Sequence, residues 1–130
     1  MSNEITVRAS LTINNVSLQQ AFNPSPISIN QASQIASGGV QNIGTATNAE
    51  FVALGDVTTA GWSYFRNLNT STANWIDMGT GTGSTFVASI RLYGGGEIAL
   101  LPLHPTNAIA ARAFTSSTEA NSLQYWVGSR

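Results

Sequence analysis

Residues 84–103 read STFVASIRLYGGGEIALLPL, and this stretch decides the fold class. In its first half every second residue is apolar, at Phe86, Ala88, Ile90 and Leu92. A period of two is typical of a β-strand with one buried face. The three glycines at 94–96 can supply the positive φ angles of a tight reversal. We therefore predict a β-hairpin over this stretch.

Short apolar runs bounded by turn residues recur along the rest of the chain. Residues 4–13 alternate cleanly, with Ile5, Val7, Ala9, Leu11 and Ile13 on one face. Further strands are expected at 27–29, 40–46, 50–54, 62–68, 75–78, 108–114 and 123–127, whereas 31–39 is expected to be loop. Eight to ten short strands at this spacing predict an all-β, antiparallel β-sandwich of jelly-roll-like architecture. We expect one domain over 1–130, with 1–14 as an N-terminal strand or an arm used in assembly.

The composition is typical of a subunit of a larger protein assembly. Charged residues make up only 8% of the chain, against about 25% in an ordinary globular domain. All five basic residues are arginines, so the polar surface must consist mostly of Ser, Thr, Asn and Gln. Such a surface has little charge repulsion to keep copies apart. A neutral soluble domain with no assembly role is the simpler alternative.

Several classes of partner and compartment are disfavoured by the sequence. A net charge of −1 and scattered arginines give no electrostatic footprint for nucleic acid. No apolar run approaches the roughly 20 residues that span a bilayer. The first ten residues, MSNEITVRAS, lack the apolar block of a signal peptide, so we expect synthesis in the cytoplasm. With no cysteine, the fold must rest on its core or on neighbouring subunits.

The motifs that resemble catalytic or cofactor sites are better explained as turns. His104 is the only histidine, whereas a cupin-type metal site needs several histidine and carboxylate ligands. A hydrolase triad would use His104 as its base, but no nucleophile elbow accompanies it in the sequence. The segment 79–84, GTGTGS, has neither the lysine of a phosphate loop nor a following helix. Asp56 and Asp77 could be paired glycosidase carboxylates, but both adjoin turn glycines. We predict no enzyme activity and no catalytic, cofactor or metal residues.

Aromatic residues are the remaining candidates for binding. We single out Trp62, Trp75, Asp77 and Tyr93 as candidate interface or glycan-contact residues. Aromatic rings beside Asp or Asn suit sugar stacking, and Trp62, Trp75 and Asp77 would be the trio for that purpose. Three tryptophans on short strands more often supply core area, about 200 Å² each.

The chain resembles a family of small bacteriophage virion proteins. The similarity is carried by the segments GDV (55–57), GW (61–62), FRNL (65–68), WIDMG (75–79), STF (84–86) and GEIALLPL (96–103), and by 4–14. It extends over nearly the whole chain. Ala60 stands where a proline is common, and Leu92-Tyr93-Gly94 replaces a turn containing Lys or Pro. These motifs are structural and not catalytic.

The resemblance implies a jelly-roll-like sandwich on the surface of a phage capsid. It implies a decoration (cement) protein that binds the outer shell and bridges neighbouring capsomers. Its partners would be the major capsid protein and further copies of itself, with a homotrimer favoured because quasi-three-fold positions recur over an icosahedral shell. The alternative is a tail or fibre-associated attachment module that binds host glycans. Neither function calls for a cofactor, nucleic acid or a membrane.

Overall fold

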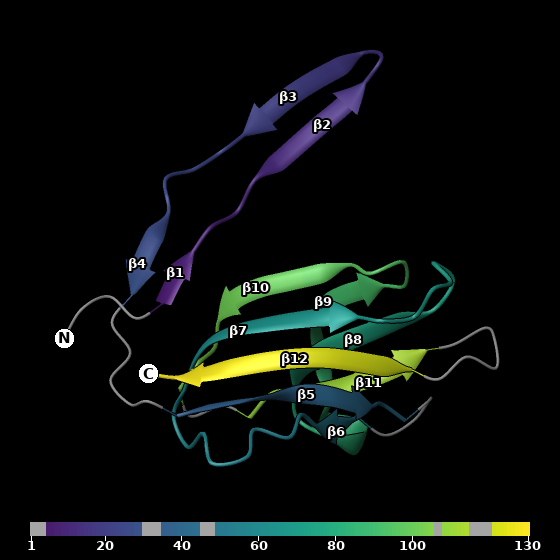
Figure 1. Cartoon of the computed structure of the whole chain (residues 1–130). Helices are drawn as coiled ribbons and strands as arrows, with labels where there is room; N and C mark the ends of the chain where they lie inside the picture. The colour runs from purple at the N-terminus through teal and green to yellow at the C-terminus, as the bar shows by residue number, and fades with distance from the viewer. Residues whose placement is uncertain (1–4, 30–34, 45–48, 106–107, 115–120) are drawn as a thin grey trace. The chain divides into compact units, whose positions relative to one another are not determined.

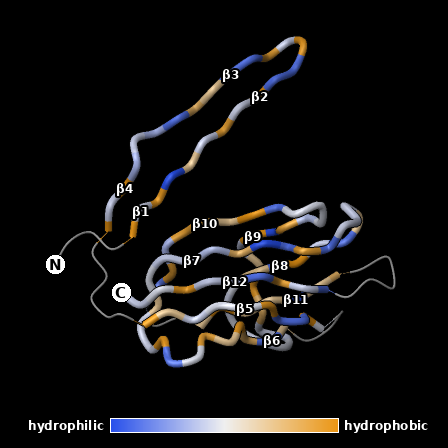
Figure 2. The backbone as a smooth tube through the Cα atoms, in the orientation of Figure 1, coloured by the Kyte–Doolittle hydropathy of each residue, from blue (hydrophilic) through white to orange (hydrophobic). Residues whose placement is uncertain are grey.

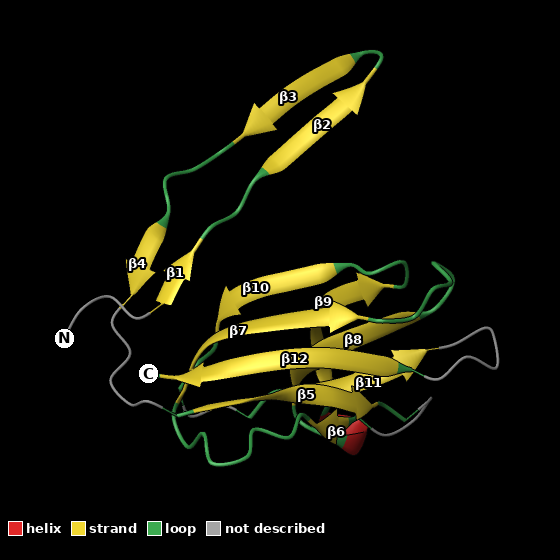
Figure 3. Ribbon diagram, in the orientation of Figure 1, coloured by secondary structure: helices red, strands yellow, loops and turns green. Residues whose placement is uncertain are grey.

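The computed structural model describes residues 5–29, 35–44, 49–105, 108–114 and 121–130. Contacts within the chain group it into two compact units, Met1–Ala32 and Ser33–Arg130. The expectation of one domain over 1–130, with 1–14 as a strand or an arm, stays a prediction. All described elements are strands except one short 3-10 turn, η1 (Gly83–Thr85), as Figure 3 shows. The prediction of an all-β chain is confirmed.

The N-terminal unit is a β-ribbon made of two antiparallel pairs. β1 (Ile5–Val7) pairs with β4 (Ile27–Ile29), and β2 (Leu11–Asn15) pairs with β3 (Leu18–Phe22). The alternating run at 4–13 is thus divided between two strands, with its described residues half-buried or exposed. The alternation did predict strand, and the described residues of this run are not among the buried core residues.

The second unit is a sandwich of two four-stranded antiparallel sheets, drawn in Figure 1. One sheet has the order β10-β7-β12-β5, and the other has the order β6-β11-β8-β9. The strands are β5 (Ala36–Asn42), β6 (Glu50–Phe51), β7 (Ala60–Asn67), β8 (Trp75–Thr80), β9 (Val87–Tyr93), β10 (Ile98–Pro102), β11 (Ala110–Phe114) and β12 (Ser122–Ser129). β5 begins at Ala36, so the end of the predicted loop 31–39 is strand, and 31–34 lie outside the described residues.

The pairing of these eight strands is that of a jelly roll. The first strand pairs with the last, the second with the seventh, the third with the sixth and the fourth with the fifth: β5 with β12, β6 with β11, β7 with β10, β8 with β9. A long hairpin folded over into two sheets gives this pattern. The tip of that hairpin lies between β8 and β9, where Gly81 and Gly83 have φ of 78° and 55°. The predicted jelly-roll-like sandwich is therefore confirmed.

The glycine run 94–96 does not close a hairpin, contrary to the sequence prediction. β9 pairs with β8 and β10 pairs with β7, so the chain crosses from one sheet to the other at this run. Gly95 and Gly96 do have positive φ angles, 87° and 91°. The loop before β8 explains the crossing, because the Gly94 and Gly95 N–H groups donate to the carbonyl oxygens of Asn74 (2.7 Å) and Asn69 (2.6 Å). A Cβ on Gly94 would overlap the Ser71 carbonyl.

The hydrophobic core lies between the two sheets. Its fully buried large side chains include Phe65, Ile76, Met78, Leu123 and Val127. The predicted inward residues of β9 are present in part: Leu92 is buried and Ile90 packs against the core, but Ala88 is exposed. With the core filled by alternate residues of each strand, the remaining residues form two outer faces that are open to partners.

Candidate interaction surfaces

The outer face of the sheet β6-β11-β8-β9 carries an aromatic–arginine cluster, defined by Trp75, Asp77, Arg91, Tyr93, Arg112 and Phe114. Strand register explains the gathering. Tyr93 and Phe114 are the cross-strand partners of Trp75, and Arg91 and Arg112 are the partners of Asp77. Partners directly opposite each other in an antiparallel pair project from the same face. The cluster is thus one aromatic row beside one charged row.

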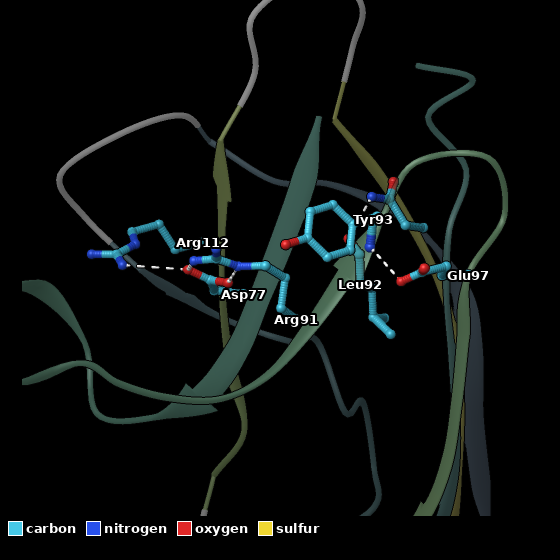
Figure 4. Close-up of polar contacts among 7 residues, drawn as sticks. Asp77, Arg91, Leu92, Tyr93, Glu97 and Arg112 are labelled. Carbon is cyan, nitrogen blue, oxygen red and sulfur yellow. Dashed lines mark hydrogen bonds and ion pairs between the residues drawn. The ribbon is translucent and has the colours of Figure 1, made fainter. Parts of the chain in front are cut away.

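The charged row is a carboxylate held between two guanidinium groups (Figure 4). Arg91 makes a bidentate pair with Asp77, Nε to Oδ1 at 2.7 Å and Nη2 to Oδ2 at 3.0 Å. Arg112 adds an ion pair from Nη2 to Asp77 Oδ2 at 3.6 Å. The hydrogen bond to Asp77 is the main cause that raises the pKa of Arg91 above its ordinary value, with a smaller contribution from Tyr93. Arg91 is therefore a cation at neutral pH. The positive charges of Arg91 and Arg112 compensate the charge of the Asp77 carboxylate within the chain.

The aromatic row is likewise packed against itself. Trp75 stacks on Phe114 at a centroid distance of 4.0 Å, and Tyr93 meets Trp75 edge-on at 6.1 Å. The Arg91 guanidinium lies over the Trp75 ring at 4.6 Å. Aromatic stacking of this kind stabilises a fold by about 1 kcal/mol. The cation–π contact of the exposed Arg91 adds to the packing of the row. These contacts also leave little of the Trp75 ring free to stack on a sugar.

The outer face of the other sheet is different in character. Its apolar sheet face is defined by Val40, Trp62, Tyr64, Ile98, Leu100 and Trp126, contributed by all four strands. Tyr64 is the cross-strand partner of both Leu100 and Trp126, so these three form one row. Val40 and Ile98 are each 58% exposed, and Leu100 is 40% exposed. Arg66, opposite Ile98, is the charged residue on this face within the described strands.

Trp126 lies flat on this sheet because two neighbours are glycines. A Cβ on Gly38, its partner on β5, would come within 3.2 Å of the indole, and one on Gly128 within 2.8 Å. The indole ring therefore fills the space that side chains at positions 38 and 128 would otherwise occupy. Trp126 is nevertheless 37% exposed, so its outer side remains available for contact.

The four residues singled out from the sequence do not form one site. Trp75, Asp77 and Tyr93 belong to the aromatic–arginine cluster, whereas Trp62 lies in the other sheet, opposite Pro102. Trp62 therefore does not lie beside Trp75 and Asp77, the other two members of the predicted trio. Sequence reasoning did not include Arg91, Arg112 and Phe114, although each alternates with buried residues of its strand. Their convergence depends on the register between strands far apart in the sequence.

His104 lines a cavity of about 170 Å³ at one end of the sandwich. Apolar side chains form most of the wall, among them Met78, Ile90, Leu101 and Ile109. None of its described lining residues is a carboxylate that could orient the imidazole. Within the described ranges, no three His, Asp or Glu residues converge as metal ligands, and no helix is long and apolar enough to cross a membrane.

Comparison of the chain with protein-family models, with curated proteins and with solved structures found no match. The resemblance to phage virion proteins therefore stays a prediction from the sequence motifs.

Proposed function

We propose that this chain is a virion structural protein of a bacteriophage, a capsid decoration protein on the outer surface of the head. As a homotrimer it binds the major capsid protein and bridges neighbouring capsomers. The observation that carries the proposal is an eight-stranded jelly roll with one outer sheet face that is apolar and nearly uncharged. Jelly rolls are common among viral capsid and lectin domains. The virion-protein motifs of the sequence support the same function.

The surface chemistry supports attachment by many weak contacts. The chain has five basic and six acidic residues, and two arginines and one aspartate are already paired in the aromatic–arginine cluster. Strong electrostatic docking is therefore not the basis of binding. A trimer that places three identical surfaces on one shell gains affinity through effective concentration, without any single strong contact. A structural role also needs no catalytic group.

Glycan binding is the second candidate function, and the aromatic–arginine cluster is the observation that favours it. Tyr93 and Phe114 are 41% and 48% exposed, beside two arginines that could contact an acidic sugar. Against it, the Trp75 ring is already stacked on Phe114 and in contact with the Arg91 guanidinium. The decoration function therefore has the better support.

Electron microscopy of the intact phage particle tests the proposal. A decoration protein is expected as jelly-roll density in trimers on the outer head surface, at positions between capsomers. Density for the chain at the tail or fibres would contradict the proposal and favour the attachment function. Binding of purified protein to immobilised host polysaccharide, lost in Arg112→Gln, would point the same way.

A further inference from the structure

The N-terminal ribbon is amphipathic. In the β2–β3 pair, Leu11 lies opposite Phe22, Ile13 opposite Gln20, and Asn15 opposite Leu18. Because directly opposed residues share a face and neighbours alternate, the four large apolar side chains of these strands project from one side. The other side carries Thr12, Asn14, Gln19 and Ala21. Figure 2 shows that each of these strands contains both apolar and hydrophilic residues.

The large apolar side chains on this side of the ribbon are exposed. Leu11, Ile13, Leu18 and Phe22 are 57%, 36%, 47% and 66% exposed. All residues of β2 and β3 are exposed, so the pair has no core of its own. An isolated two-stranded ribbon is marginally stable at best in water. A surface outside the ribbon is therefore needed to hold it in this amphipathic form.

The apolar sheet face of the sandwich has the matching properties. It is apolar where the outer face of a sandwich is ordinarily polar, and its edge strand β10 (IALLP) carries no charge. Monomeric proteins usually protect such an edge with charged residues, bulges or a covering segment. A five-residue strand is about 17 Å long, and four strands span about 14 Å between the outer axes, so the ribbon is long enough to lie across all four strands of the face.

We propose that the N-terminal ribbon of one copy covers the apolar sheet face of a second copy. Charge supports this occupant, because Arg8 is the single charged residue in 5–29 and Arg66 the one on the face. Neither surface selects a charged partner. Each copy carries one ribbon and one face, so exchange between copies satisfies every surface in a closed ring such as a trimer. The inference concerns how copies join, and it does not depend on what the assembly binds.

Single-cysteine variants test the exchange directly, because the chain has no cysteine of its own. Full-length Ile13→Cys and a distinguishable, tagged Leu100→Cys chain are co-expressed and treated with a short bis-maleimide. Cross-linked heterodimers are expected. Asn14→Cys, on the polar side of the ribbon, is the matched control and should give at least tenfold less product with Leu100→Cys. Equal product from both ribbon positions, or none from either, overturns the proposal. A double variant that carries Ile13→Cys and Leu100→Cys in one chain is treated in the same way. If only this double variant cross-links, within its own chain, the proposal is also overturned.

A second measurement asks whether the ribbon's apolar side holds the oligomer together. Phe22→Ser removes its largest side chain, and Ala21→Ser makes a comparably polar change on the other side. Light scattering over a concentration series should show dissociation at a concentration at least tenfold higher for Phe22→Ser, as for an interface anchor. Trp62, Trp75 and Trp126 all lie in the sandwich, so unchanged tryptophan fluorescence verifies that it stays folded. The same assembly in both variants, or a monomeric parent chain, refutes the exchange.

Discussion

Replacement of Asn67 by leucine tests how the two sheets of the sandwich are held together at one end. Asn67 is the last residue of β7 and is fully buried. Its Nδ2 donates to the carbonyl oxygen of Leu92, in the opposite sheet, at 2.9 Å. Its Oδ1 accepts from the Asn69 N–H at 3.0 Å, where the chain leaves the strand. Leucine has a similar volume but can do neither.

The expected loss of stability follows from those two bonds. The buried Asn69 N–H is left without its acceptor, which costs about 1–3 kcal/mol, and the lost bond to Leu92 costs about 1 kcal/mol more. The added apolar burial offsets part of this, so we expect Asn67→Leu to lower the free energy of unfolding by about 2–4 kcal/mol. That is a large share of the 5–15 kcal/mol typical of a folded domain.

Urea unfolding followed by tryptophan fluorescence measures this loss, at one fixed protein concentration because an oligomer's stability depends on it. Asn42→Leu is the matched control. Asn42 is exposed, and its Oδ1 accepts from Ser122 Oγ at 3.0 Å in contact with water. Its loss should cost less than about 1 kcal/mol. If the two variants unfold within about 0.5 kcal/mol of each other, buried asparagine bonds do not hold this end of the sandwich together.

Two further predictions concern the sheet crossing and the oligomer. Gly94→Ala should destabilise the chain by about 2–4 kcal/mol, because its Cβ would overlap the Ser71 carbonyl. Gly39→Ala should change stability by less than about 1 kcal/mol, because the atom nearest to its Cβ would be 3.8 Å away. Equal denaturation midpoints would contradict the close approach at Gly94. The proposed homotrimer should persist from low to molar salt in light scattering, because exposed ion pairs contribute only about 0–1 kcal/mol and are screened. Dissociation as salt rises would contradict apolar assembly.

The local periodicity of the sequence predicted most of the strands but not their partners. The apolar and aromatic runs at 62–68, 75–78 and 123–127 each fall on a strand of the sandwich. The crossing at 94–96 could not be predicted, because it depends on hydrogen bonds to Asn69 and Asn74, which lie far earlier in the sequence. The same limit applies to the candidate site. The two-residue repeat of a strand places Asp77 and Trp75 on one face. Only the register between β8 and β11 brings Arg112 and Phe114 beside them.

The alternation at 4–13 shows a second limit of sequence patterns. An apolar face predicts that something covers it, and in Ile5–Ile13 the pattern is as regular as in any strand of the core. A sequence does not say whether the cover is the same chain or another molecule. Here the structure leaves the side chains of β2 and β3 exposed, so the periodicity indicates the strands but not what lies against their apolar side.

The two outer faces of the sandwich differ in whether their interactions are complete. On the sheet β6-β11-β8-β9, Asp77 is neutralised by arginines and Trp75 is packed by Phe114 and Arg91, so the cluster needs no partner to be stable. On the opposite sheet, Leu100, Ile98 and Val40 have cross-strand neighbours but remain 40%, 58% and 58% exposed. Water contact is unfavourable for those side chains at about 25 cal/mol per Å². Association by this chain should therefore begin at the apolar sheet face and leave the aromatic–arginine cluster outside the contact.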